Sequence, residues 1–317
     1  MTQDTISSLQ GQMGIGHVRY PTAGSSSCQE AQPFYTNTPC GICLAHNGNL
    51  NNSAELKMQL KMRHSNTNSD SELLMNTLAD EIVKHLNSSG SRSVNTEIVF
   101  KAVTGLQKRV RGSYAAVVLI HGVGILAFRD PYGIRPLVYG VKNVKEGKNY
   151  VVASESVAID VLGYDICRDV GPGEAILFGL NGTMHSRVCA QGPKLSPCIF
   201  EYVYFARPDS IVDGVSVYEA RLQMGRQLAK HIQDKYVIFS FSLSLSLSPN
   251  LTTNLTTHTH THTGTPRTRL IASCQFPIQV ERQLFRLRTS WVYRIVRDSS
   301  RIDTLRERSS CPVRLNV

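Results

Sequence analysis

The sequence has no apolar run of about 18 residues, the minimum that a membrane-spanning helix needs. Its start, MTQDTISSLQGQ, has neither the basic region nor the apolar stretch of a secretory signal peptide. The eight cysteines among 317 residues are too few and too scattered for a small disulfide-rich secreted scaffold. These absences predict a protein with no membrane partner that stays in the cytoplasm with mostly reduced thiols.

Lysine is missing from residues 236–317, although this region holds 11 arginines against four acidic residues. It therefore carries +7 of the net charge of +10, and the first 235 residues are nearly balanced. A protein that binds nucleic acid usually has a basic surface on its folded body. We therefore expect no nucleic-acid partner.

Two segments of the same region alternate strictly with a period of two, SFSLSLSLS (Ser240–Ser248) and THTHTHT (Thr257–Thr263). Repeated TC in DNA encodes alternating Ser and Leu, and repeated AC encodes alternating Thr and His. We therefore interpret residues 236–317 as an aberrant, low-complexity and Arg-rich tail, and we expect it to be disordered. One alternative is that Ser240–Ser248 forms an alternating strand. Another is a metal site on His258, His260 and His262, but these three histidines have no fixed fourth ligand.

Strand-like and helix-like segments alternate between residues 11 and 187, which predicts a layered α/β fold. Short turns such as 130–133 join the later strand candidates and favour antiparallel pairing over a doubly wound parallel sheet. Helices are expected at 53–63, 71–86 and 97–110, the first two with Asn52 and Ser69 as caps and Glu72 completing a capping box. The strand candidates are rich in β-branched residues and bounded by glycine: 13–20, 41–47, 113–121, 124–130, 136–141, 149–154, 174–180 and 184–189.

Three short blocks combine residue types that can bind and activate an amide substrate. They are HVRYPTAG from His17, LAHNGNL from Leu44 and NSDSELL from Asn68. Each has an ordinary alternative, such as a surface arginine, a hairpin Asn-Gly or an acidic residue at a helix start. Taken together in this order, the blocks resemble the glutamine site of the type 2 glutamine amidotransferases, which belong to the N-terminal nucleophile hydrolases. This resemblance implies a four-layer αββα sandwich, here incomplete.

The resemblance also implies a role for individual residues. Arg19 is expected to bind the α-carboxylate of glutamine and Asp70 its ammonium group, with Thr22 as a further substrate-binding residue. A planar guanidinium suits a carboxylate, and a carboxylate suits an ammonium ion. The Asn47 side-chain amide and the Gly48 backbone N–H are expected to form the oxyanion hole, which stabilises the tetrahedral intermediate.

Later blocks resemble one family within this group, the amidophosphoribosyltransferases. They are AFRDPYGIRPLVYG from Ala127, VASESVA from Val152, VGPGEAI from Val170 and CIFEYVYFARPDS from Cys198. The resemblance implies transfer of the amide nitrogen of glutamine to phosphoribosyl pyrophosphate, giving 5-phosphoribosylamine in the first step of de novo purine biosynthesis. In intact relatives it further implies homo-oligomers, a magnesium site and, in some, an iron–sulfur cluster with Cys198 as one ligand.

The same resemblance divides the chain into four parts. Residues 1–10 do not match the family, and residues 11–197 are expected to be a partial glutaminase domain. Residues 198–235 would be the interdomain segment and the first helix of a phosphoribosyltransferase domain, before the tail at 236–317. The acidic strand and phosphate-binding loop of that domain are not found after Ala229, so no magnesium or other cofactor is expected on this chain.

The catalytic nucleophile of the family is an N-terminal cysteine whose own amino group acts as base. It does not occur in the start of this sequence, and Thr2 lies too close to Gly11 to replace it. Cys40 and Cys43 have the spacing of half a metal site, but on a strand their side chains point to opposite faces. We therefore expect a catalytically incompetent copy; the alternative is a non-catalytic glutamine-binding or decoy subunit.

Overall fold

The computed structural model describes residues 11–18, 30–60, 65–145, 147–246 and 292–295; for 234–246 and 292–295 it describes the backbone alone. The chain divides into two compact units, Met1–Tyr218 with Thr289–Val317, and Glu219–Arg288. All the sheets lie in the first unit, and the second contains most of one long helix. In the described part, no helix is both long and apolar enough to cross a lipid bilayer.

The first sheet contains six antiparallel strands and holds the HNG block in its interior. Its spatial order is β1-β2-β3-β4-β8-β9. Both faces of the central strands are buried: on β3, Tyr114 and Ala116 face one core, whereas Ala115 and Val117 face another. This explains why these strands are apolar at nearly every position. Their bounds are Phe34–Thr36 (β1), Ile42–Leu50 (β2), Gly112–Ile120 (β3), Gly124–Arg129 (β4), Glu174–Gly179 (β8) and Met184–Val188 (β9).

The second sheet contains four antiparallel strands in the order β12-β6-β5-β7. Their bounds are Val138–Val144 (β5), Gly147–Ala153 (β6), Asp165–Asp169 (β7) and Val292–Ile295 (β12). Phe178 of the first sheet packs against Tyr139 and Tyr150 of the second, with ring centroids 6.2 and 5.0 Å apart. The two sheets therefore share an apolar core between their facing surfaces.

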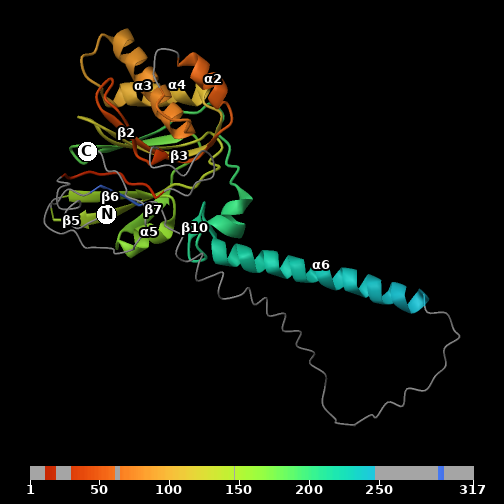
Figure 1. Cartoon of the computed structure of the whole chain (residues 1–317). Helices are drawn as coiled ribbons and strands as arrows, with labels where there is room; N and C mark the ends of the chain where they lie inside the picture. The colour runs from red at the N-terminus through yellow and green to blue at the C-terminus, as the bar shows by residue number, and fades with distance from the viewer. Residues whose placement is uncertain (1–10, 19–29, 61–64, 146, 247–291, 296–317) are drawn as a thin grey trace, which may run out of the picture. The chain divides into compact units, whose positions relative to one another are not determined.

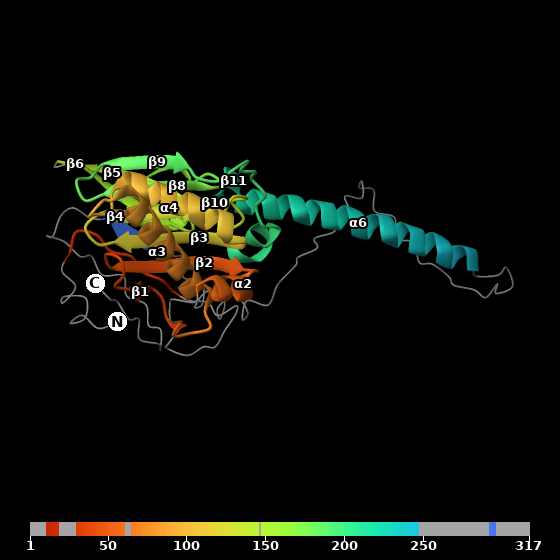
Figure 2. The same ribbon diagram turned by 90° about the horizontal axis from the view of Figure 1, so that it is seen from above.

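Helices cover the outer face of each sheet (Figure 1), and the view from above in Figure 2 shows those that lie over the first sheet. On the first sheet lie α2 (Ser53–Gln59), α3 (Asp70–Ser89) and α4 (Thr96–Arg109), whose apolar stripes join the core below them. On the second sheet lies α5 (Ser156–Val161), which buries Ala158 and Ile159 against it. The layers are helix, sheet, sheet, helix, so the predicted αββα fold is confirmed.

Some local predictions were wrong. Residues 14–18 are not a strand, and strands β1 and β7 and helix α5 were not predicted. Asn52 does not cap α2: its amide instead bonds the Arg109 carbonyl at 2.9 Å and the Arg111 N–H at 3.0 Å. Glu72 does not complete a capping box either, because its carboxylate accepts hydrogen bonds from the preceding loop at residues 66–67. In each case a long-range or loop partner replaces the local partner that the pattern predicts.

Beyond β9 the chain forms a short π-helix η2 (Glu201–Phe205), the hairpin β10 (Ile211–Val212) and β11 (Val215–Ser216), and helix α6 (Val217–Ser246). Residues up to Tyr218 belong to the first unit. Within the tail at 236–317 that was predicted to be disordered, the structure describes α6 as far as Ser246 and residues 292–295, which pair with β6; the rest of the tail lies outside the described residues, and its disorder stays a prediction. A helix that has already formed gains one hydrogen bond per added residue, so an alternating Ser-Leu sequence can extend it.

Candidate active site

The HNG block lies on β2, which pairs with β1 and β3 in the first sheet. His46, Asn47 and Gly48 are paired with Ala116, Ala115 and Tyr114 of β3. Gly48 allows the strands to approach closely: its φ is +153°, and a Cβ atom there would lie 2.0 Å from the Ser113 carbonyl oxygen. Any larger residue would push β2 and β3 apart. The sheet therefore requires glycine where the predicted oxyanion hole needs an accessible backbone N–H.

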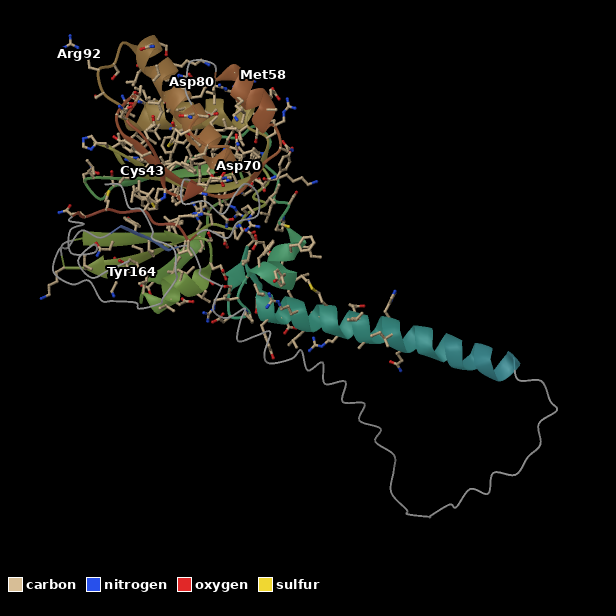
Figure 3. All side chains as sticks on the ribbon, in the orientation of Figure 1. Cys43, Met58, Asp70, Asp80, Arg92 and Tyr164 are labelled. Carbon is tan, nitrogen blue, oxygen red and sulfur yellow. The ribbon has the colours of Figure 1, made fainter. Side chains whose placement is uncertain are left out.

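Asp70 is the first residue of α3 and lies beside the end of β2. One of its carboxylate oxygens, Oδ2, accepts the Leu50 N–H at 3.0 Å, and the other, Oδ1, lies 4.0 Å from His46 Nδ1. The side chain is 20% exposed, so the carboxylate reaches solvent. Figure 3 shows Asp70 at the end of α3 nearest the sheet and Asp80 farther along the same helix. The structure thus brings Asp70 to the strand that carries Asn47 and Gly48.

His46 is buried and positions the site rather than carrying charge in it. Its Nδ1 lies 3.0 Å from Ser71 Oγ, and its backbone N–H donates to Gln32 Oε1 at 2.7 Å. Burial lowers the pKa of His46, although the nearby Asp70 carboxylate acts in the opposite direction. The neutral imidazole therefore joins the start of α3 to β2 and keeps Asp70 next to the HNG block.

The Asn47 side chain contacts a residue that sequence reasoning did not single out. Arg135 Nη2 donates a hydrogen bond to Asn47 Oδ1 at 3.0 Å. A guanidinium has only donors, so it can bind only the oxygen end of the amide. The Nδ2 end, which an oxyanion hole needs as donor, then points away from Arg135.

The loop that carries Arg135 is tightly held by Asp130. The Asp130 carboxylate accepts backbone N–H groups of Tyr132 at 2.8 Å, Ile134 at 3.0 Å and Tyr114 at 3.2 Å. Burial raises the pKa of Asp130, whereas these N–H groups act to lower it. An aspartate that bonds the backbone two residues ahead is typical of a tight Asx turn. The Asp-Pro-Tyr-Gly segment thus attaches the loop to the start of β3.

Arg129 holds the same loop from inside the protein. It is fully buried, and its guanidinium donates to the carbonyl oxygens of Arg135 at 2.8 Å, Gly133 at 2.6 Å and Val170 at 2.6 Å. Its charge is balanced by Asp213, with 2.8 Å between Nη1 and Oδ1. A buried charge needs both a partner and satisfied donors, and Arg129 has both. The RDPYGIRP segment is therefore a rigid support for Arg135.

Two of the predicted substrate-binding residues, Arg19 and Thr22, lie outside the described residues. The described chain stops next to them at Val18, which follows the buried His17. Of the predicted site residues, the structure therefore brings together Asn47, Gly48 and Asp70.

The cysteines of the described part lie mainly in packing positions. Cys43 lies on β2 in the core between the sheets, whereas Cys40 packs against the core under the helices from the turn before β2, so the two are not on one strand as predicted. Burial raises the pKa of both thiols. Figure 3 shows Cys43 within the sheet layers. Among the described residues no three His, Cys, Asp or Glu side chains are placed to hold a metal, and Cys198 is half-buried on the chain that leads to η2.

Sequence reasoning missed Gln32, Ser71 and Arg135, which orient His46 and Asn47. Arg135 and Ser71 had a visible signal, because they lie in the AFRDPYGIRPLVYG and NSDSELL blocks that carry the family resemblance. Gln32 is an ordinary polar residue outside these blocks, and only the fold places it beside His46.

Residues 17–161 match the family described as the glutamine amidotransferase domain. Among curated proteins, the chain is 55% identical to the amidophosphoribosyltransferase of Pasteurella multocida over 227 residues, 71% of this chain and 44% of that protein. It is 54% identical to the Escherichia coli enzyme over 71% of this chain and 44% of the relative. The Saccharomyces cerevisiae enzyme is 49% identical over 73% and 46%. The chain thus spans less than half the length of the curated relatives it matches.

Solved structures agree with these matches. A glutamine phosphoribosylpyrophosphate amidotransferase from B. subtilis, complexed with ADP and GMP, superposes with a TM-score of 0.54 at 32% identity, covering 68% of this chain and 43% of its own. A structure described as the allosteric regulatory enzyme of purine biosynthesis gives a TM-score of 0.55 at 34% identity, with the same coverage of 68% and 43%. With the αββα layers and the HNG block on β2, these matches show that the chain is similar to the amidophosphoribosyltransferases over the part that carries their glutamine amidotransferase domain.

Proposed function

We propose that the αββα domain binds glutamine and stabilises the oxyanion that forms when the side-chain amide of glutamine is attacked. The observation that carries this proposal is the convergence of three groups at one end of the first sheet. Asn47 and Gly48 are adjacent on β2, and Asp70 bonds the backbone of Leu50 on the same strand at 3.0 Å. A carboxylate that selects an ammonium group thus lies beside two donors suited to a developing negative charge.

Each residue has one chemical role in this proposal. Asp70 Oδ1, on a carboxylate that is partly exposed, accepts the α-ammonium group of glutamine, while Oδ2 stays bonded to Leu50. Attack on the substrate amide moves negative charge onto its oxygen, which then receives hydrogen bonds from Asn47 Nδ2 and the Gly48 N–H. One such donor typically lowers the barrier by about 3 kcal/mol. By resemblance, Arg19 and Thr22 hold the α-carboxylate end.

For the intact protein we propose the complete reaction of the relatives. The amide nitrogen of glutamine would be transferred to phosphoribosyl pyrophosphate to give 5-phosphoribosylamine, the first step of de novo purine biosynthesis. This proposal is supported by relatives named amidophosphoribosyltransferases, to which the chain is 55% and 54% identical over the aligned residues. A cytoplasmic location and a homo-oligomer of intact copies belong to the same proposal.

The metal groups of the relatives do not fit the described residues. An iron–sulfur cluster needs several thiolates, and Cys198 is not joined by two other ligating side chains in the described ranges. The same applies to the acidic residues that a magnesium site needs. We propose that both groups belong to intact relatives.

We further propose that this chain does not turn over glutamine. A cysteine nucleophile reacts as a thiolate. Burial raises the pKa of the thiols of Cys40, Cys43 and Cys189, so little thiolate forms at any of them at neutral pH. The alternative function is a non-catalytic glutamine-binding or decoy subunit. It is favoured because Asn47, Gly48 and Asp70 are brought together, whereas Cys40, Cys43 and Cys189 are not reactive thiols.

Isothermal titration of the full chain with glutamine tests the binding proposal. We expect binding in the unsubstituted chain and its loss in Asp70→Ala, because no other group is expected to hold the ammonium ion. Asp80→Ala on the same helix is the matched control, since Asp80 lies farther along α3 and pairs with Arg109 at 2.6 Å. Equal glutamine affinity of the unsubstituted chain and Asp70→Ala would contradict the assignment. Hydrolysis of glutamine by the unsubstituted chain would contradict the proposed lack of turnover.

A further inference from the structure

The two ends of the Asn47 side-chain amide have almost the same shape but opposite polarity. An oxyanion hole works only if Nδ2 faces the substrate, because Oδ1 would repel the developing negative charge. Rotation by 180° about the last side-chain bond exchanges the two ends. Some other group must therefore set the orientation of this amide.

We propose that Arg135 is a positioning residue of the oxyanion hole, which holds the Asn47 amide with Nδ2 toward the substrate, and that Glu201 keeps Arg135 in place. The proposal rests on the proposed binding of glutamine at Asn47 and Gly48. Arg135 Nη2 lies 3.0 Å from Asn47 Oδ1, and a guanidinium offers no acceptor to Nδ2. The flipped amide would lose this hydrogen bond and place two donors against each other.

Arg135 is itself restrained at several points. Its Nη1 forms an ion pair with Glu201 Oε1 at 2.6 Å, and its guanidinium carbon lies 5.2 Å from the centre of the Phe205 ring. Its backbone carbonyl accepts the Arg129 Nε–H at 2.8 Å. The side chains of Arg135 and Glu201 are 19% and 4% exposed, so water screens their attraction weakly. A long side chain held in this way gives up little further freedom when it orients a neighbour.

The segment that carries Glu201 is joined by its backbone to the loop that carries Arg135. The N–H groups of Lys194, Ser196 and Cys198 donate to the carbonyl oxygens of Pro131, Tyr132 and Ile134, at 3.1, 2.8 and 3.4 Å. The Glu201 N–H then donates to the Cys198 carbonyl at 3.1 Å. Glu201 and Arg135 therefore belong to one connected piece of structure, although 66 positions separate them in the sequence.

The test observes the Asn47 amide directly, by NMR of the full chain labelled with 15N in its asparagine side chains. The Asn47 signals are assigned by their loss in Asn47→Asp. We expect Arg135→Ala to move these two proton signals toward the values of solvent-exposed asparagine amides. Arg135→Lys should restore part of the difference because lysine also has only donors, and Glu201→Gln should give an intermediate shift. Arg187→Ala, which removes an exposed ion pair with Glu97, is the matched control and should leave the signals unchanged.

The variants also separate this proposal from the proposed function. In an intact relative that has the cysteine nucleophile and hydrolyses glutamine, the substitution equivalent to Arg135→Ala should lower kcat for this hydrolysis about 10- to 100-fold. KM should change little, because the interaction acts in the transition state. If the unsubstituted chain does not bind glutamine, the proposed function is contradicted. The Asn47 amide signals would still decide the role of Arg135. Asn47 signals that are the same in the unsubstituted chain, Arg135→Lys and Glu201→Gln would overturn the proposal even if Arg135→Ala fails to fold.

Discussion

Replacement of Gly48 by alanine should separate β2 and β3, two neighbouring strands of the first sheet. The new Cβ would lie 2.0 Å from the Ser113 carbonyl oxygen and 2.7 Å from His46 Nε2, at a φ of +153°. Both neighbours are fixed, one by the sheet and the other by burial. Overpacking in a rigid site costs about 1–3 kcal/mol and a disfavoured backbone conformation a further 1–3 kcal/mol. We therefore expect the free energy of unfolding to fall by about 2–6 kcal/mol.

Urea unfolding followed by far-UV circular dichroism measures this change. Gly90→Ala is the matched control, because Gly90 ends α3 at a φ of +62° with no atom within 4 Å of the new Cβ. It carries the backbone cost without the clash and should lose only about 1 kcal/mol. If Gly48→Ala were no less stable than Gly90→Ala, the close approach of β2 and β3 at the HNG block would be refuted.

Three further predictions concern buried charges and thiols. Burial raises the pKa of Glu201 to about 7. The charges of Arg135 and Arg129 act to lower this pKa, whereas those of Glu155 and Asp213 act to raise it. The folded state therefore binds this proton more tightly than the unfolded state does. The free energy of unfolding should fall by about 3 kcal/mol as pH rises from about 4.5 to 7. Urea titrations at several pH values measure this dependence, and Glu201→Gln should remove most of it. Asp213→Ala should lower the free energy of unfolding by about 3–5 kcal/mol because it leaves the buried Arg129 without its counter-charge, and a loss below 1 kcal/mol in the same assay would contradict that role. A maleimide should label the exposed Cys167 of the native chain much faster than the buried Cys43, as mass spectrometry of peptides would show, and equal rates would contradict the intersheet position of Cys43.

The elements that could be predicted are those with a strong local pattern. Strands β3, β4 and β8 are apolar at nearly every position, as is the first half of β2, and α3 and α4 have a clear apolar stripe. Strand β7 was missed because DICRD is mostly exposed and charged, and it is recognised as a strand only by its pairing with β5. Helix α5 has six residues, too few for a periodic pattern to emerge.

For the site, the residue types of His46-Asn47-Gly48 and of Asp70 were sufficient to predict an oxyanion hole and an ammonium ligand from the resemblance. Their mutual placement was not predictable from spacing, because Asp70 reaches β2 through the packing of α3 on the sheet. The tertiary structure alone decided which end of the Asn47 amide is available. That choice depends on Arg135, 88 residues later, and on Glu201 beyond it. The periodicity of apolar residues predicts which side chains are buried. The orientation of the Asn47 amide, whose two ends have almost the same shape, depends instead on the charged group that the fold places beside it.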